Sequence, residues 1–245
     1  MKRLLKGVFE LRPPTPRYAY IWDANVVLEF LKNFEPNQDM PLSYLTYKLV
    51  MLLALATAQR AQTLHSIRID DIVYGKDLVI IPITGMLKHS TPRNRKLSLH
   101  LREYKTCAAI CVVQVLKEYV KRTESLRLNE RKLFISFHKP HAGVSKTTIS
   151  RWIKSVLEEA GIDTNVFTAH SAGSAACAQY TREGLHVDEI LKWLDGLIIR
   201  PSKSSMTRSL WWQRLDHFHW STLKSHLFSS IPTSPKQGNC RIIVA

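Results

Sequence analysis

Three cationic side chains are spaced so that folding could bring them to one anion. Arg60 lies in the segment Ala58–Leu64, directly after a strongly apolar stretch, and His170 opens a segment of small residues about 110 positions later. Lys88 falls between them, in a basic connection between two alternating stretches. A guanidinium binds two phosphate oxygens at once and stays charged. A histidine at a helix start adds its ring to the unpaired backbone N–H groups of the first turn. These residue types therefore predict a phosphate-binding site.

This order of arginine, hairpin lysine and histidine box resembles the catalytic domain of the tyrosine recombinases, phage-integrase-like enzymes that transfer DNA strands. The resemblance covers roughly residues 40–196, and the histidine box is similar to that of eukaryotic transposon-type members. It implies that Arg60 clamps a scissile phosphate, that Lys88 protonates the leaving 5′ oxygen and that His170 lies beside the phosphate. Lys96 is a rival for the lysine role, and a phosphate-positioning cation is the plainer interpretation of Lys88. No metal or other cofactor is implied, because side chains supply the electrostatic stabilisation.

The sequence departs from the family pattern where the chemistry is most demanding. Gly173 stands where the histidine box carries its second arginine, and Gly196 occupies the next family position, a His or Trp. Of eight tyrosines, only Tyr180 follows His170, and a helix of ten residues would separate the two by about 15 Å. Residues 200–210, where the nucleophilic tyrosine is expected, contain serines and a threonine instead. Losing one phosphate-stabilising donor costs roughly 10²–10³ in rate, so strand cleavage is expected to be impaired.

An excess of positive charge favours a polyanionic partner. The 245 residues include 35 Lys and Arg against 20 Asp and Glu, which gives a formal net charge of +15. Lys and Arg that neutralise phosphates release counterions, which drives binding. We therefore expect double-stranded DNA as the partner, with a homo-oligomer on DNA left open. Besides Arg60 and Lys88, the residues expected to contact DNA are His89, Arg93, Arg95, Lys96, Lys146 and Arg151.

Hydrophobic periodicity predicts the elements that would position these residues. Apolar residues at 3.6-residue spacing predict a helix from Ser43, which ends just before Arg60 and is followed by a short helix over 61–67. Alternating residues predict two strands between 69 and 101, where Pro82 favours an edge or a bulge.

Capping residues mark the helices of the second half. Ser145 is expected to cap an amphipathic helix, and Thr168 is expected to cap the helix that carries His170. The remaining predicted elements are helices over 24–34 and 108–121 and a short strand over 133–137.

Together these elements predict a mainly helical α+β fold with a small antiparallel sheet, of the tyrosine-recombinase catalytic type. We expect an N-terminal arm and short helix over 1–40, a catalytic domain over 41–228 and a disordered tail over 229–245. Because the first region is too short for the separate helical DNA-clamping domain of the family, affinity for DNA is expected to be modest and steeply salt-dependent.

Nothing in the sequence indicates a membrane or a secretory route. The longest apolar run, Leu49 to Ala56, is far shorter than the ~18 residues of a membrane span. The N-terminus lacks the apolar stretch of a signal peptide, and the four cysteines show no metal-site or disulfide spacing. We expect an intracellular protein, in the nucleus or elsewhere.

Two further interpretations stay open at this level. One is a non-catalytic DNA- or chromatin-binding module on the same scaffold, and the other is the product of a decaying gene with no selected role. The sequence fixes neither the target DNA, nor the oligomeric state, nor the role of residues 197–245.

Overall fold

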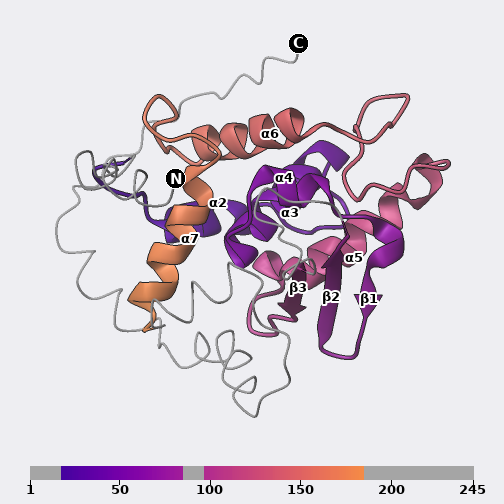
Figure 1. Cartoon of the computed structure of the whole chain (residues 1–245), viewed down its shortest axis with the longest axis horizontal. Coiled ribbons are helices and arrows are strands. Elements are labelled where there is room, and N and C mark those ends of the chain that lie inside the picture. Colours follow the sequence, from indigo (N-terminus) through magenta and orange to yellow (C-terminus); the bar gives the residue numbers. More distant parts are fainter. Residues whose placement is uncertain (1–17, 85–96, 185–245) are drawn as a thin grey trace, which may run out of the picture. The chain divides into compact units, whose positions relative to one another are not determined.

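The computed structural model describes residues 18–84 and 97–184 (Figure 1). All of these residues belong to one unit of the chain, within Met1–Ser202. This described part contains six α-helices and a small sheet, which lies between the third and fourth of them in the sequence. They are α2 (Ala24–Lys32), α3 (Leu42–Thr57), α4 (Ala61–His65), α5 (Val112–Thr123), α6 (Lys146–Glu159) and α7 (Ser171–Arg182). The expected mainly helical fold with a small sheet is confirmed.

Helix α3 forms the centre of this unit because it is buried on nearly every side. Eleven of its 16 residues are buried, which is the pattern of a core helix rather than a surface helix. Helices α2, α4, α5, α6 and α7 all contact it. In Figure 1, α6 lies on one side of α3 and α4, and the sheet with α5 lies on the other. The helix predicted from Ser43 thus positions every other described helix.

The sheet has three antiparallel strands in the order β1 (Val73–Tyr74), β2 (Leu78–Ile83), β3 (Leu97–Arg102). Buried and half-buried residues alternate along β2, as the period-two pattern predicts. Pro82 pairs with Ser98 of β3, but β1 is too short to reach it. Although β2 is the middle strand, Pro82 therefore has a paired strand on one side only, as a proline at a local edge requires. The connection 85–96, which carries Lys88, lies outside the described residues.

Most predicted helix boundaries are confirmed to within a few residues. Ser145 caps α6 by accepting the backbone N–H of Thr148 at 3.1 Å. Gly161 follows α6 with a φ of 82°, a conformation that favours glycine. The region predicted as a helix over 108–121 begins with a 3₁₀ turn at Ala108–Ile110 before α5 starts. Along the described residues, no helix is both long and apolar enough to cross a membrane.

The strand predicted over 133–137 is wrong. A single isolated bridge occurs there, between Ile135 and Gly143. The guanidinium of Arg127 donates to the carbonyls of Lys132 and Leu133, so these groups are bound by a side chain rather than by a neighbouring strand. A buried arginine thus binds the carbonyl at the start of the predicted strand.

Thr168 as the cap of the last described helix is also wrong. His170 is the N-cap residue, and α7 begins at Ser171 without a side-chain cap. The hydroxyl of Thr168 is instead hydrogen-bonded to that of Tyr18 at 3.0 Å. The Thr168 hydroxyl therefore makes a tertiary contact with Tyr18, where the local sequence pattern predicted a helix cap.

Candidate nucleic-acid interface

The junction between α3 and α4 carries Arg60 at the protein surface. Helix α3 ends at Ala58, which turns the chain with a left-handed φ of 49°. Arg60 then caps α4 from an extended conformation, and its carbonyl accepts the N–H of Thr63 at 2.9 Å. The hydroxyl of Thr63 donates to the side-chain oxygen of Gln59 at 3.1 Å. These bonds hold the backbone around Arg60 while its side chain is exposed.

The turn before α7 carries His170, also exposed. The next residue, Ser171, is fully buried. Its hydroxyl donates to the Thr168 carbonyl at 2.7 Å and accepts the indole N–H of Trp22 at 2.8 Å. No local sequence pattern signals Trp22, because its partner lies 149 residues away.

The elements that carry Arg60 and His170 pack directly against each other. A Cβ added to Gly173, in the first turn of α7, would lie 3.1 Å from the carbonyl oxygen of Ala58. Further along α7, the hydroxyl of Tyr180 donates to the Leu55 carbonyl at 2.8 Å. Helix α7 thus runs along the C-terminal end of α3, and its start meets the junction where Arg60 caps α4. The structure therefore brings the segments that carry these two residues into contact.

Two other residues singled out by the sequence, Gly173 and Tyr180, lie at the contact between α7 and the end of α3. Gly173 has no side chain, and its position lies tightly against the Ala58 carbonyl. Burial raises the pKa of the Tyr180 phenol, and the hydroxyl is donated to a main-chain carbonyl. Tyr180 is thus held as a neutral structural donor, whereas a nucleophile would have to lose its proton.

The remaining predicted residues divide between α6 and the parts of the chain outside the described ranges. Lys146 is the first residue of α6 and Arg151 lies in its second turn, and both side chains are exposed. The predicted residues that lie outside the described ranges are Lys88, His89, Arg93, Arg95, Lys96 and Gly196.

The sequence missed a contact between a lysine and a histidine, Lys132 and His65, at the other end of α4. The Nζ atom of Lys132 lies 2.9 Å from Nε2 of His65. Because an ammonium only donates, this nitrogen accepts and the imidazole is neutral. Burial, and then the charges of Lys132 and Lys146, hold the pKa of His65 below its ordinary range. Since α4 contacts α6, the predicted Lys146 approaches the end of the helix that Arg60 begins.

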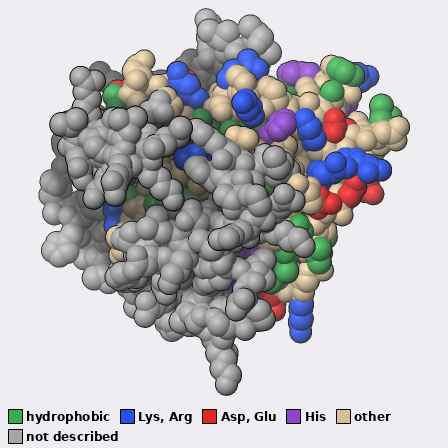
Figure 2. All heavy atoms as spheres, in the orientation of Figure 1, with side chains coloured by type: hydrophobic (Ala, Val, Ile, Leu, Met, Phe, Trp, Pro, Cys, Tyr) green, Lys and Arg blue, Asp and Glu red, His purple; other side chains and the backbone are tan. Residues whose placement is uncertain are grey.

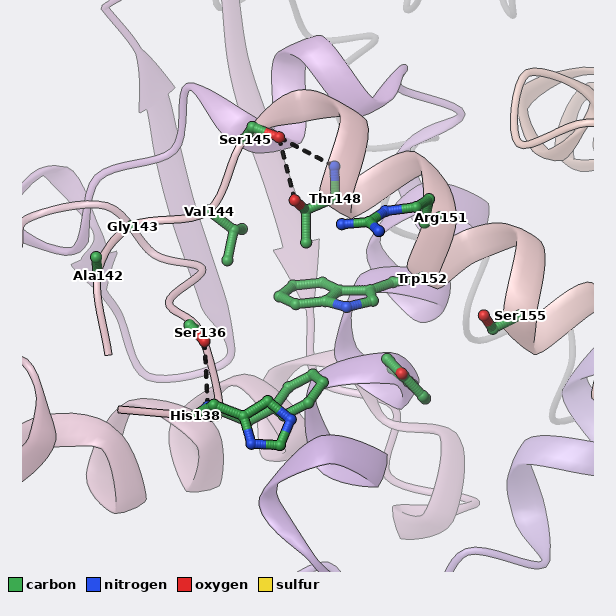
Figure 3. A pocket seen from close by; sticks show the side chains of 12 residues that line it. Ser136, His138, Ala142, Gly143, Val144, Ser145, Thr148, Arg151, Trp152 and Ser155 are labelled. Carbon is green, nitrogen blue, oxygen red and sulfur yellow. Dashed lines mark hydrogen bonds between the residues drawn. The ribbon is translucent and has the colours of Figure 1, made fainter. Parts of the chain in front are cut away.

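Figure 3 shows an open pocket of about 600 Å³ between the first half of α6 and the loop before it. Tyr47, Phe137 and Trp152 form its aromatic wall, with ring centroids 5.6, 5.9 and 6.1 Å apart. The Arg151 side chain lies beside the Trp152 indole in this view. None of the described residues that line the pocket is acidic. Figure 2 shows further Lys, Arg and His side chains on the side where Figure 1 places α6.

Comparison with known proteins supports a single family. The model of the phage integrase family matches residues 22–195, whereas a search of curated proteins finds no match. Three solved structures share the fold at low sequence identity. They are the XerH site-specific recombinase bound to its difH substrate (12% identity, TM-score 0.56, 87% of this chain and 54% of that chain), the XerA recombinase (18%, 0.52, 92% and 69%) and the integrase of mycobacterium phage Brujita (14%, 0.53, 85% and 62%).

These similarities confirm the expected fold type, a tyrosine-recombinase catalytic domain with its helices and small antiparallel sheet. The chain spans about half to two thirds of the length of the solved relatives that it matches. The family match covers most of the sequence and includes α2 to α7. This chain therefore belongs to the phage integrase family of tyrosine recombinases.

Proposed function

We propose that this chain binds duplex DNA at a phosphodiester through Arg60 and His170, with Lys88 beside the leaving oxygen, and that it does not cleave the strand. The observation that carries the proposal is the packing of the first turn of α7 on Ala58. It brings the histidine box against the junction that bears Arg60. The side chains of Arg60 and His170 are both exposed, and the guanidinium of an arginine matches the geometry and charge of a phosphate. The contact is assigned to these side chains, because the N–H groups of Ser171 and Ala172 at the start of α7 already donate to the carbonyls of Thr168 and Ala169.

The charge around α4 and α6 supports contact with the DNA backbone beyond this phosphate. Lys146 and Arg151 are exposed on α6, and Lys132 with His65 lies at the end of α4 nearest Lys146. The formal net charge of +15 adds a long-range attraction for a polyanion. These residues are proposed to hold the duplex without reading its sequence, as phosphate contacts do.

The proposal that cleavage is lost rests on what the two remaining family positions contain. Gly173 replaces an arginine, and the half-buried Tyr180 donates its hydroxyl to the Leu55 carbonyl. No tyrosine occurs over 200–210, and a serine there would need an adjacent base to become a nucleophile. Descent from a mobile-element recombinase, without its strand transfer, is part of the same proposal.

A nicked suicide substrate tests the proposal, because such DNA traps any covalent adduct. The full chain should bind the duplex, form no adduct and lose affinity at least about tenfold in each of the variants Arg60→Ala and His170→Ala, as expected for charged hydrogen bonds to phosphate. Glu29→Ala, on the exposed surface of α2, is the control. An adduct that maps near residues 200–210 would overturn the loss of cleavage, and unchanged affinity in both variants would overturn the phosphate site.

The second candidate function is a non-catalytic DNA- or chromatin-binding module built on the same scaffold. The glycine at position 173 favours it, and it would use the same phosphate site. It predicts that duplex DNA competes better than single-stranded RNA of equal length at every salt concentration. Equal competition by the two polyanions would point to unspecific charge attraction instead.

A further inference from the structure

We infer that the segment Tyr18–Trp22 positions the phosphate site, with Tyr18, Trp22 and Ser171 acting as positioning residues for His170. The inference rests on the proposed function, because it concerns the same site. Its basis is a set of long-range hydrogen bonds that bracket the histidine on both sides.

A continuous chain of hydrogen bonds joins Trp22 to the turn before α7. The indole N–H of Trp22 donates to the Ser171 hydroxyl at 2.8 Å, and that hydroxyl donates to the Thr168 carbonyl at 2.7 Å. Trp22 is only 5% exposed and Ser171 is fully buried. In a site closed to water, such linked bonds strengthen one another, and each is costly to leave unmade.

Tyr18 holds the same turn from its other end. Its hydroxyl is bonded to the Thr168 hydroxyl at 3.0 Å. Its ring and that of Tyr20 both pack on Phe167, with centroid distances of 5.4 and 5.3 Å. An ion pair between Asp23 and Arg182 at 3.1 Å adds little, because both groups are exposed.

The consequence for His170 follows from its place between these anchors. Thr168 and Ser171 are both tied to residues 18–22, while His170 itself is exposed. On its far side, the first turn of α7 rests on Ala58. The turn is thus held before any ligand arrives, and a preorganised site binds more tightly because less motion is lost on binding.

The chain offers matched pairs of substitutions that separate positioning from stability. Tyr18→Phe removes the hydroxyl that is bonded to Thr168. Tyr20→Phe is its control, because the Tyr20 ring packs on the same residue, Phe167, but Tyr20 is 64% exposed. Ser171→Ala removes the central hydroxyl, whereas Ser174→Ala makes the same change at an exposed position of the same helix.

The test measures duplex affinity, the NMR resonance of the His170 ring and the unfolding midpoint of the full chain, at a temperature where every variant is folded. Tyr18→Phe and Ser171→Ala should each lose roughly threefold to tenfold in affinity, the range of one hydrogen bond, and should shift the His170 resonance. Tyr20→Phe and Ser174→Ala should match the wild type in both. Wild-type affinity and an unmoved resonance in the two test variants, with binding still lost in His170→Ala, would overturn the inference alone. Wild-type affinity in His170→Ala and Arg60→Ala would overturn the proposed function and the inference with it.

Discussion

Ala58 adopts a backbone conformation that suits glycine, two residues before the arginine on which the proposed site depends. Its φ of 49° places the backbone of Ala58 in the left-handed region. This conformation costs a residue with a Cβ about 1–2 kcal/mol. We predict that Ala58→Gly raises the free energy of unfolding by about 1 kcal/mol, after the greater freedom of glycine in the unfolded chain is subtracted. Chemical denaturation measures the change.

Ala178→Gly, inside α7, is the matched control for this substitution. A glycine in the middle of a helix costs about 1 kcal/mol relative to alanine, so the two variants should change stability in opposite directions. If both destabilise the protein, the strain assigned to Ala58 is wrong.

The contact between His65 and Lys132 predicts a measurable shift in the pKa of His65. Burial first, and then the nearby lysines, lower the pKa of His65. Lys132→Met should raise that pKa toward its ordinary value without reaching it, since burial remains. A titration followed by NMR measures the shift, and Lys154→Met, an exposed lysine of α6, should leave the pKa where it is.

The same pair gives the sign of one contribution to the pH dependence of stability. Because the folded protein binds the His65 proton less readily than the unfolded chain, this contribution is present above the unfolded pKa of about 6.5. It is lost as the pH falls from there through the folded value. Lys132→Met should flatten that decline, and an unchanged decline would show that His65 is not its source.

At the scale of elements, sequence patterns correctly predicted those helices, strands and caps that depend on interactions between neighbouring residues. The apolar residues of α3, the alternation of β2 and the Ser145 cap are properties of neighbouring residues, and the structure confirms all three. Over 133–137 the structure has one isolated bridge, and the Leu133 carbonyl accepts from the side chain of Arg127, a residue outside the segment. No periodicity in the sequence reports that kind of contact.

Arg127 therefore organises a segment that lacks regular structure. It is only 5% exposed, donates to the hydroxyl of Thr123 and to two main-chain carbonyls, and lies 5.7 Å from the ring centre of Tyr119. Arg127→Leu should destabilise the protein by roughly 3 kcal/mol, because the buried Leu133 carbonyl and the partly buried Lys132 carbonyl then lose their donor. Arg131→Leu, an exposed neighbour paired with Asp70 at 3.4 Å, should cost less than about 1 kcal/mol. Equal losses in denaturation would contradict the role assigned to Arg127.

Across the whole molecule, the sequence identified Arg60 and His170 of the proposed site but not the long-range hydrogen bonds that position them. Arg60 and His170 stand in short motifs that a single sequence displays, and the family resemblance assigned both a place. The bonds that fix the site join residues 149 or 150 positions apart. The pair of His65 and Lys132 spans 67 positions. Such contacts depend on how helices pack, which composition and spacing do not encode.

The central claim is that Arg60 and His170 bind one phosphate together, and a double-mutant cycle on duplex affinity tests it most directly. Arg60→Ala, His170→Ala and the double variant would be compared at one fixed salt concentration. Residues that share a ligand group should be coupled by at least about 0.5 kcal/mol, so that the double variant departs from the sum of the single losses. Losses that add to within about 0.3 kcal/mol would show two independent contacts, and wild-type affinity in either single variant would contradict the account.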